Sequence, residues 1–214
     1  MRCEYAIVVA TDIANTAAEL RDAWSSDDGD YRSTFITPAN TGDSLEELSD
    51  ALFYLDLDVA DRKLAIPTGI NEACAALSCP QSVESPYSQF SLDSIKANLQ
   101  SFNILMTGGS GLGFDDLIEA AGVPELNRRF ADNTAAAIAL IDTASESLFV
   151  QASAIDSSAA ETECTNAYAN PDVIGRFSAC NLLGMIKLIN DDQKIGFVAA
   201  IDVDLPDRAQ SDND

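Results

Sequence analysis

The sequence predicts an all-α fold, a helical bundle of up-down helices joined by long connecting loops. Apolar residues recur three or four positions apart through most of the chain, which is the spacing of an amphipathic helix. The strand-like stretch 198–205 has no second stretch with which it could pair, so a sheet is not expected. With 214 residues, 47% of them hydrophobic, the chain is long enough to bury a substantial core.

The first helix is expected over residues 2–24. A loop rich in Thr, Pro, Asn and Gly follows and runs to Asp43. The second helix is expected to begin with a capping box, in which Ser44 accepts from the third amide and Glu47 reaches back. It should end near Lys63. The apolar face of the first helix is expected to be formed by Tyr5, Val9, Ile13, Leu20 and Trp24.

Residues 67–90 are expected to form a long connection with one short helix over 70–76. Ser91 should then cap a third helix, which the glycines within 108–113 end, and a short helical turn is expected over 114–120. The core-facing side chains of the third helix are expected to be Ile95, Leu99, Phe102 and Met106.

Pro124 suits the first turn of a long fourth helix, whose apolar stripe is expected to reach Leu148. Helical pattern resumes over 152–167. A further helix should open at the Asn170-Pro171 pair and run through Ile189, and a last short helix is expected from Asp191 onward.

The charge balance excludes several classes of function. The formal net charge is −23, from 35 acidic and 12 basic residues. Such a surface repels phosphate backbones, so no nucleic-acid partner is expected. No apolar run reaches the roughly 18 residues that a membrane span requires. No transmembrane segment is therefore expected.

The chain contains no histidine. This removes the usual general base and the commonest transition-metal ligand. The acidic groups at 27–30 and at 56–61 lack the spacing of an EF-hand and are interpreted as solvated. The glycine-rich stretch 107–113 lacks the lysine of a phosphate-binding loop, so it is interpreted as a turn. No catalytic, cofactor-binding or metal-ligating residue is predicted.

The five cysteines allow two readings. Cys74 and Cys79 flank a short loop, and Cys164 and Cys180 flank the break at residues 170–171, so two disulfides can be written, with Cys3 left over. Such bonds are typical of a periplasmic or extracellular protein. The alternative is that all five are free thiols.

Several segments, in order, resemble the C-terminal part of imelysin-like proteins, the former M75 peptidase family. The first helix is similar to the one that follows the family's metal motif. Residues 60–69 resemble the family's "ADRKLG-PLG" stretch, and residues 84–117 resemble its serine-rich entry, "SL-x-x-I-x-x-N-L" helix and "G-L-D-D-L" turn. The likeness is good over residues 3–150 and loose beyond.

The resemblance implies an all-helical fold of two related bundles, of which this chain would be part, export to the periplasm or outer surface of a bacterium, and a link to iron uptake. The family's Gly-x-His-x-x-Glu motif suggests a metal ion as cofactor, but a chain without histidine cannot carry that motif. Positions matching recurring family residues are the candidates for lining a shared pocket: Asp61, Arg62, Ser91 and Asn98.

The leading hypothesis is therefore a non-catalytic imelysin-like protein that contributes scaffold and pocket wall to metal uptake. The alternatives are a metallopeptidase-type protein with its ligands upstream and a helical interaction module. An imelysin-like domain is expected over residues 1–206, truncated at its N-terminus, with a polar tail over 207–214. The missing segment or an iron-uptake protein is the expected partner.

Overall fold

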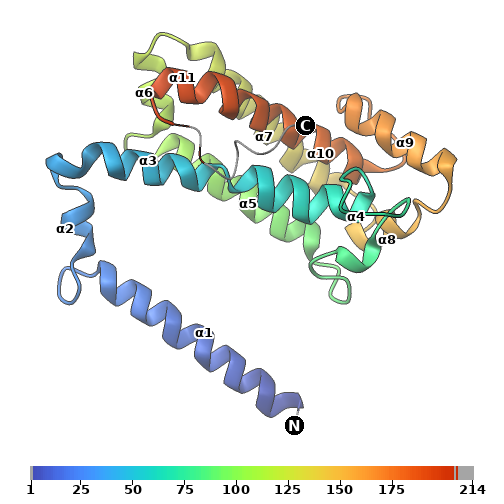
Figure 1. Cartoon of the computed structure of the whole chain (residues 1–214), viewed down its shortest axis with the longest axis horizontal. Coiled ribbons are helices and arrows are strands. Elements are labelled where there is room, and N and C mark those ends of the chain that lie inside the picture. The colour runs from blue at the N-terminus through green and yellow to red at the C-terminus, as the bar shows by residue number, and fades with distance from the viewer. Residues whose placement is uncertain (1, 205, 207–214) are drawn as a thin grey trace. The chain divides into compact units, whose positions relative to one another are not determined.

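The computed structural model describes residues 2–204 and 206, and within that part of the chain it contains helices and no strand. The predicted all-α helical fold is confirmed (Figure 1). The chain divides into two compact units, Met1–Ser49 and Asp50–Asp214, which are described separately below. The predicted polar tail 207–214 lies outside the described residues, and the predicted single domain over 1–206 stays a prediction.

The first unit begins with α1 (Arg2–Trp24), whose bounds are those predicted. Trp24 packs against the rings of Tyr31 and Phe35, with ring centroids 4.9 and 5.3 Å apart. This aromatic cluster joins α1 to α2 (Tyr31–Phe35). The rest of the predicted apolar stripe of α1 is exposed, and Tyr5 has 73% of its surface accessible.

The predicted capping box at Ser44 is wrong. After η1 (Pro38–Asn40), α3 (Thr41–Leu52) begins three residues before Ser44, which therefore lies inside the helix. Its hydroxyl donates to the Phe35 carbonyl oxygen at 2.6 Å. Ser44 thus ties α3 to the preceding α2 rather than satisfying the amides at a helix start.

The second unit is built on four long helical segments. Each of them packs against two of the others in a closed ring: η2 on α10, α10 on α7, α7 on α5, and α5 on η2 (Figure 1). This arrangement is a four-helix bundle. The four segments are η2 (Leu55–Ala65), α5 (Ser91–Thr107), α7 (Pro124–Thr143) and α10 (Ser178–Asp192).

Two segments of the bundle have the wide turn of a π-helix. In η2 the chain follows the predicted second helix, but at its end the Ile66 N–H donates to the Asp61 carbonyl oxygen, five residues earlier. The same spacing joins Val198 to Gln193 at the end of η4 (Gln193–Phe197). The π-helix is rare, and it occurs mostly as single turns inside α-helices.

The remaining elements connect the bundle. The expected short helix over 70–76 is instead a series of turns and bends, and the strand-like stretch begins with α11 rather than a strand. The connecting elements are α4 (Ile66–Thr68), η3 (Pro80–Ser82), α6 (Phe114–Ala120), α8 (Leu148–Ser153), α9 (Ser158–Ala169) and α11 (Val198–Ile201).

Two predicted helix boundaries are wrong for local reasons. The fourth helix ends at Thr143, and Ser147 caps the separate helix α8 by accepting from the Val150 N–H at 3.3 Å. The helix expected after Pro171 begins only at Ser178. Residues 171–175 fold around the buried Asn181 amide, which contacts three backbone groups of that loop.

The core of the second unit follows the predicted helical stripes. Phe102 and its neighbours on the predicted face of α5 are at most 4% exposed. Phe197 lies at the centre of a ring cluster, with centroids 5.2 Å from Phe114, 6.3 Å from Phe130 and 6.5 Å from Phe53. Such pairs add stability beyond the area that they bury.

Both suggested disulfides are present. Cys74 is bonded to Cys79, and Cys164 is bonded to Cys180, while Cys3 is a free, exposed thiol. The alternative of five free thiols is wrong. The second bond joins α9 to α10 within a small apolar cluster that includes Phe177 and Ile155. It therefore fixes α9 to α10, which has more buried residues than any other helix among the described residues.

The two disulfides should differ in their contributions to stability. The loop that Cys164–Cys180 closes spans 16 residues, whereas Cys74–Cys79 closes a loop of 5. In the chain-entropy model, replacing the longer-loop pair by alanine lowers the free energy of unfolding by about 3 kcal/mol, and replacing the shorter-loop pair lowers it by about 2 kcal/mol. Urea unfolding followed by circular dichroism compares the two double variants. Equal or reversed losses would contradict this ranking.

Candidate functional site

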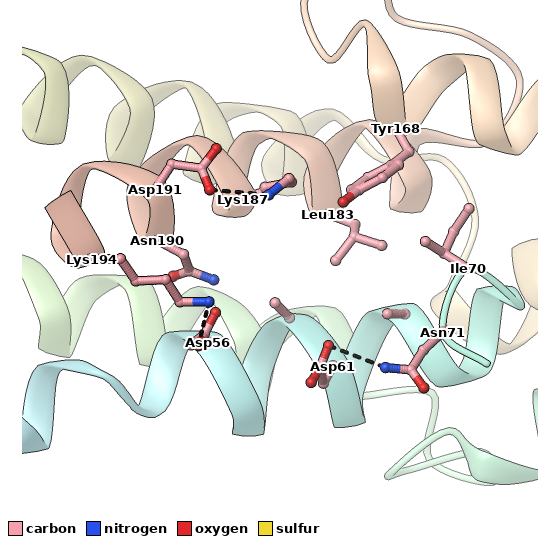
Figure 2. Close-up of a pocket in the computed structure, with 12 residues that line it drawn as sticks. Asp56, Asp61, Ile70, Asn71, Tyr168, Leu183, Lys187, Asn190, Asp191 and Lys194 are labelled. Carbon is pink, nitrogen blue, oxygen red and sulfur yellow. Dashed lines mark hydrogen bonds and ion pairs between the residues drawn. The ribbon is translucent and has the colours of Figure 1, made fainter. Parts of the chain in front are cut away.

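A small polar pocket lies between η2 and α10, beside both π-helical segments. Its volume is about 40 Å³, enough for a few water molecules or a small ion. Figure 2 shows Leu183, Asn190 and Lys194 in the space between the two helices. The lining residues are Asp56, Ala60, Asp61, Ala65, Ile70, Asn71, Tyr168, Leu183, Lys187, Asn190, Asp191 and Lys194.

A buried ion pair closes one end of this pocket. Lys194 Nζ lies 3.0 Å from Asp56 Oδ2, and the two side chains are only 19% and 7% exposed (Figure 2). Asp56 is on η2 and Lys194 on η4, so the pair joins the two π-helical segments. The interpretation of Asp56 as a solvated residue is wrong, because Asp56 is buried and paired with Lys194.

The α10 side of the pocket carries a second ion pair. Lys187 Nζ lies 3.0 Å from Asp191 Oδ1, one helical turn further on. Asn190 is 3% exposed, and its Oδ1 has no hydrogen-bond partner among the described residues. A buried amide oxygen in this state is costly unless water or a ligand donates to it. The pocket therefore offers one acceptor for a bound donor.

The loop that follows α4 forms the end of the pocket opposite the Asp56–Lys194 ion pair. The Asn71 N–H donates to the Ala65 carbonyl oxygen, and Asn71 Oδ1 accepts from the Ala73 N–H at 2.9 Å. This leaves Asn71 Nδ2 to donate to Asp61 Oδ1 at 3.3 Å (Figure 2). The Cys74–Cys79 disulfide closes the adjacent turn. The disulfide-bonded loop thus presents Asn71 to Asp61.

Close packing of α9 on α10 brings Tyr168 to the pocket. Gly184 makes this approach possible, because a Cβ added there would lie 2.3 Å from the Tyr168 carbonyl oxygen. Only glycine allows backbone to approach a helix so closely. The aromatic wall of the pocket therefore depends on a residue without a side chain.

Of the four predicted pocket-lining residues, Asp61 is the one that lines this pocket. Asp61 lines the pocket, whereas Arg62 points away and pairs with Asp58 at 2.8 Å on the exposed side of η2. Ser91 is the first residue of α5 rather than its cap, and its hydroxyl accepts from the Ser85 N–H at 3.1 Å. Asn98 lies outside this pocket. A shared pocket lined by all four stays a prediction.

Asn98 belongs to a separate polar network between η2 and α5. Its Oδ1 accepts from Lys63 Nζ at 3.1 Å, and the same ammonium lies 3.1 Å from Glu84 Oε2. The Tyr54 hydroxyl donates to the Asn98 carbonyl oxygen. Lys63, Glu84 and Asn98 all fall in segments that carry the family resemblance, so the matching stretches meet in space.

Burial raises the pKa of Tyr54 to about 12 from its ordinary 10.0. The folded state therefore holds this proton more tightly than the unfolded state does. The contribution to stability is fully present below pH 10 and is lost as the pH rises through 12. We expect unfolding by urea to become easier as the pH rises from 10 to 12. Tyr54→Phe should flatten this decline, whereas the same decline in wild type and variant would contradict it.

Sequence reasoning missed Lys187, Asn190, Asp191 and Lys194. They occupy one stretch of α10 and η4 that reads as an ordinary polar helix face, and their importance comes from η2 lying opposite. Within residues 2–204 and 206, no group of three or more His, Cys, Asp or Glu side chains is placed to hold a metal ion. No helix in this part of the chain is long and apolar enough to cross a membrane.

The fold and the pocket define an all-helical, disulfide-bonded bundle protein with a small pocket of paired charges between two of its helices. Residues 1–170 match the family model described as Imelysin (peptidase M75), and the chain therefore belongs to the imelysin family. No curated protein and no solved structure matches the chain.

Proposed function

We propose that the chain is a non-catalytic, extracytoplasmic imelysin-like protein linked to the uptake of iron or another metal in bacteria. Membership of the imelysin family supports the link. The two disulfides support a location outside the cytoplasm, because such bonds persist in oxidising compartments. The formal charge of −23 attracts cations to the surface generally.

The observation that carries the non-catalytic assignment is the internal pairing of the pocket's carboxylates. Asp56 is paired with Lys194 and Asp191 with Lys187, while Asp61 accepts from Asn71. Lysine ammonium groups inside a pocket oppose a bound cation by like-charge repulsion. In this proposal the paired carboxylates and lysines have a structural role and give the pocket wall a fixed polarity. They do not activate a metal-bound water.

The test of the biological role is growth under metal limitation. A host strain that lacks the gene should grow more slowly than its parent in medium treated with an iron chelator, and it should contain less iron. Both defects should disappear on complementation with the wild-type gene and on addition of iron. Equal growth and equal iron content in parent and deletion strain would contradict the link to uptake.

A cleavage assay separates this proposal from a metallopeptidase. The purified chain is incubated with casein and added zinc, with and without a chelator, and we expect no cleavage above the protein-free control. Chelator-sensitive cleavage would contradict the non-catalytic assignment. The Asp61→Asn variant in the same assay would then show whether this pocket is responsible.

A further inference from the structure

A second pocket is lined by residues of α5, α6 and α7, three helices that pack against one another. Its volume is about 290 Å³, close to the lower end of the range for small-molecule sites. Three buried side chains form its apolar floor: Phe102, Met106 and Phe130 are 1%, 4% and 3% exposed. The two rings stand edge to face, with centroids 5.9 Å apart.

The wall of this pocket carries an unsatisfied acceptor. Asn127 Nδ2 donates to the Asp115 carbonyl oxygen at 2.7 Å, which fixes the orientation of the amide. Asn127 Oδ1 is buried and has no hydrogen-bond partner among the described residues. An N–H or O–H donor on a ligand would satisfy this oxygen and remove the cost of leaving it unpaired.

The charges around the pocket determine whether it attracts a cationic or an anionic ligand. Arg128 lines the pocket, but its guanidinium lies 2.7 Å from Glu125 Oε2 and 3.1 Å from Asp132 Oδ2. Its positive charge is therefore already matched by two carboxylates. Asp115 adds a further carboxylate to the lining. The surroundings are net negative, so they attract a cation and repel a carboxylate ligand.

We propose that this pocket binds a small arylalkylamine, in which an aromatic ring is joined through a methylene group to a protonated amine. The ring lies on Phe102 and Phe130 and contacts the Met106 sulfur, an arrangement that favours aromatic over aliphatic groups. The ammonium group donates to Asn127 Oδ1 and is attracted by Asp115. This site is separate from the pocket between η2 and α10, and its ligand class does not depend on metal uptake.

Three probes of similar size test the ligand class: benzylamine, benzoate and toluene. Each is titrated into the isotopically labelled protein and followed by NMR. We expect benzylamine to shift the side-chain amide of Asn127, with a Kd on the order of 1 mM for so small a ligand. Benzoate and toluene should bind at least about tenfold more weakly, a difference of about 1.4 kcal/mol. Equal affinity for the three probes would overturn the proposal.

Two matched pairs of variants test the position of the site. Ala131→Trp fills the pocket and should abolish the shifts, whereas Ala135→Trp, at an exposed position one turn further along α7, should leave them unchanged. Asp115→Asn should weaken benzylamine about threefold to tenfold, whereas Glu119→Gln, exposed on the same helix, should not. Benzylamine binding that survives Ala131→Trp, or that Ala135→Trp removes equally, would overturn the proposal.

Discussion

Phe197→Ala should lower the free energy of unfolding by about 4 kcal/mol, the middle of the range for truncating a buried aromatic residue. Phe197 is fully buried, and its ring contacts those of Phe53, Phe114 and Phe130. Truncation leaves a cavity among three rings, of which Phe114 lies on α6, Phe130 on α7 and Phe53 in the turn between α3 and η2. Urea unfolding followed by circular dichroism gives the measurement.

Two further variants test whether the loss of stability in Phe197→Ala comes from the cavity that it creates. Phe197→Leu keeps most of the apolar volume and should cost less than about 1.5 kcal/mol. Phe90→Ala removes a ring that is 58% exposed and should change stability by no more than about 0.5 kcal/mol. A loss below about 1 kcal/mol for Phe197→Ala would show that the ring cluster is not the centre of the core.

Lys194→Met should destabilise the protein by about 3 kcal/mol, because it leaves the buried Asp56 carboxylate without its ammonium partner. The cost comes from the uncompensated charge more than from the lost attraction. Adding Asp56→Asn to Lys194→Met should therefore restore part of the stability. A double-mutant cycle from the same urea measurements gives the coupling between the two sites.

The matched control is an exposed ion pair. Arg128 and Glu125 are 63% and 72% exposed, so Arg128→Ala should cost less than about 1 kcal/mol. Strictly additive losses for Asp56→Asn and Lys194→Met, or a loss for Lys194→Met no larger than that for Arg128→Ala, would contradict a buried pair between η2 and η4.

Local sequence signals predicted the parts of the fold that local physics determines. Helix α1 has the bounds that its apolar spacing predicts, and the face of α5 from Ile95 to Met106 is buried as expected. Both disulfides were identified from cysteines that flank short breaks. In each case the interacting residues lie near one another in the chain.

The errors arise where a side-chain hydrogen bond outside the helix signal decides the local structure. Ser44 and Ser91 have the residue type of helix caps, but their hydroxyls bond to the Phe35 carbonyl oxygen and to the Ser85 N–H. Residues 171–175 carry helix-start signals, yet the side chain of Asn181 holds them in a loop. A preference at one residue is weak beside a complete set of tertiary hydrogen bonds.

The candidate site was the least predictable part. Asp61 was singled out by its family position, and it lines the pocket. Lys194 was missed because it and Asp56 are 138 positions apart (194 minus 56), and only the packing of η2 against α10 and η4 reveals the pair. The π-helical turns were also missed, since the spacing of apolar residues such as Leu55 and Val59 fits an ordinary α-helix equally well.

The most direct test of the account is calorimetric titration of the purified chain with Fe²⁺ and Zn²⁺, in about 0.15 M salt so that general attraction to the acidic surface is screened. If the pocket between η2 and α10 is a wall of paired charges, no saturable binding tighter than a Kd of about 10 µM should be seen for either ion. Stoichiometric binding with a Kd below about 1 µM, lost in Asp61→Asn, would contradict it.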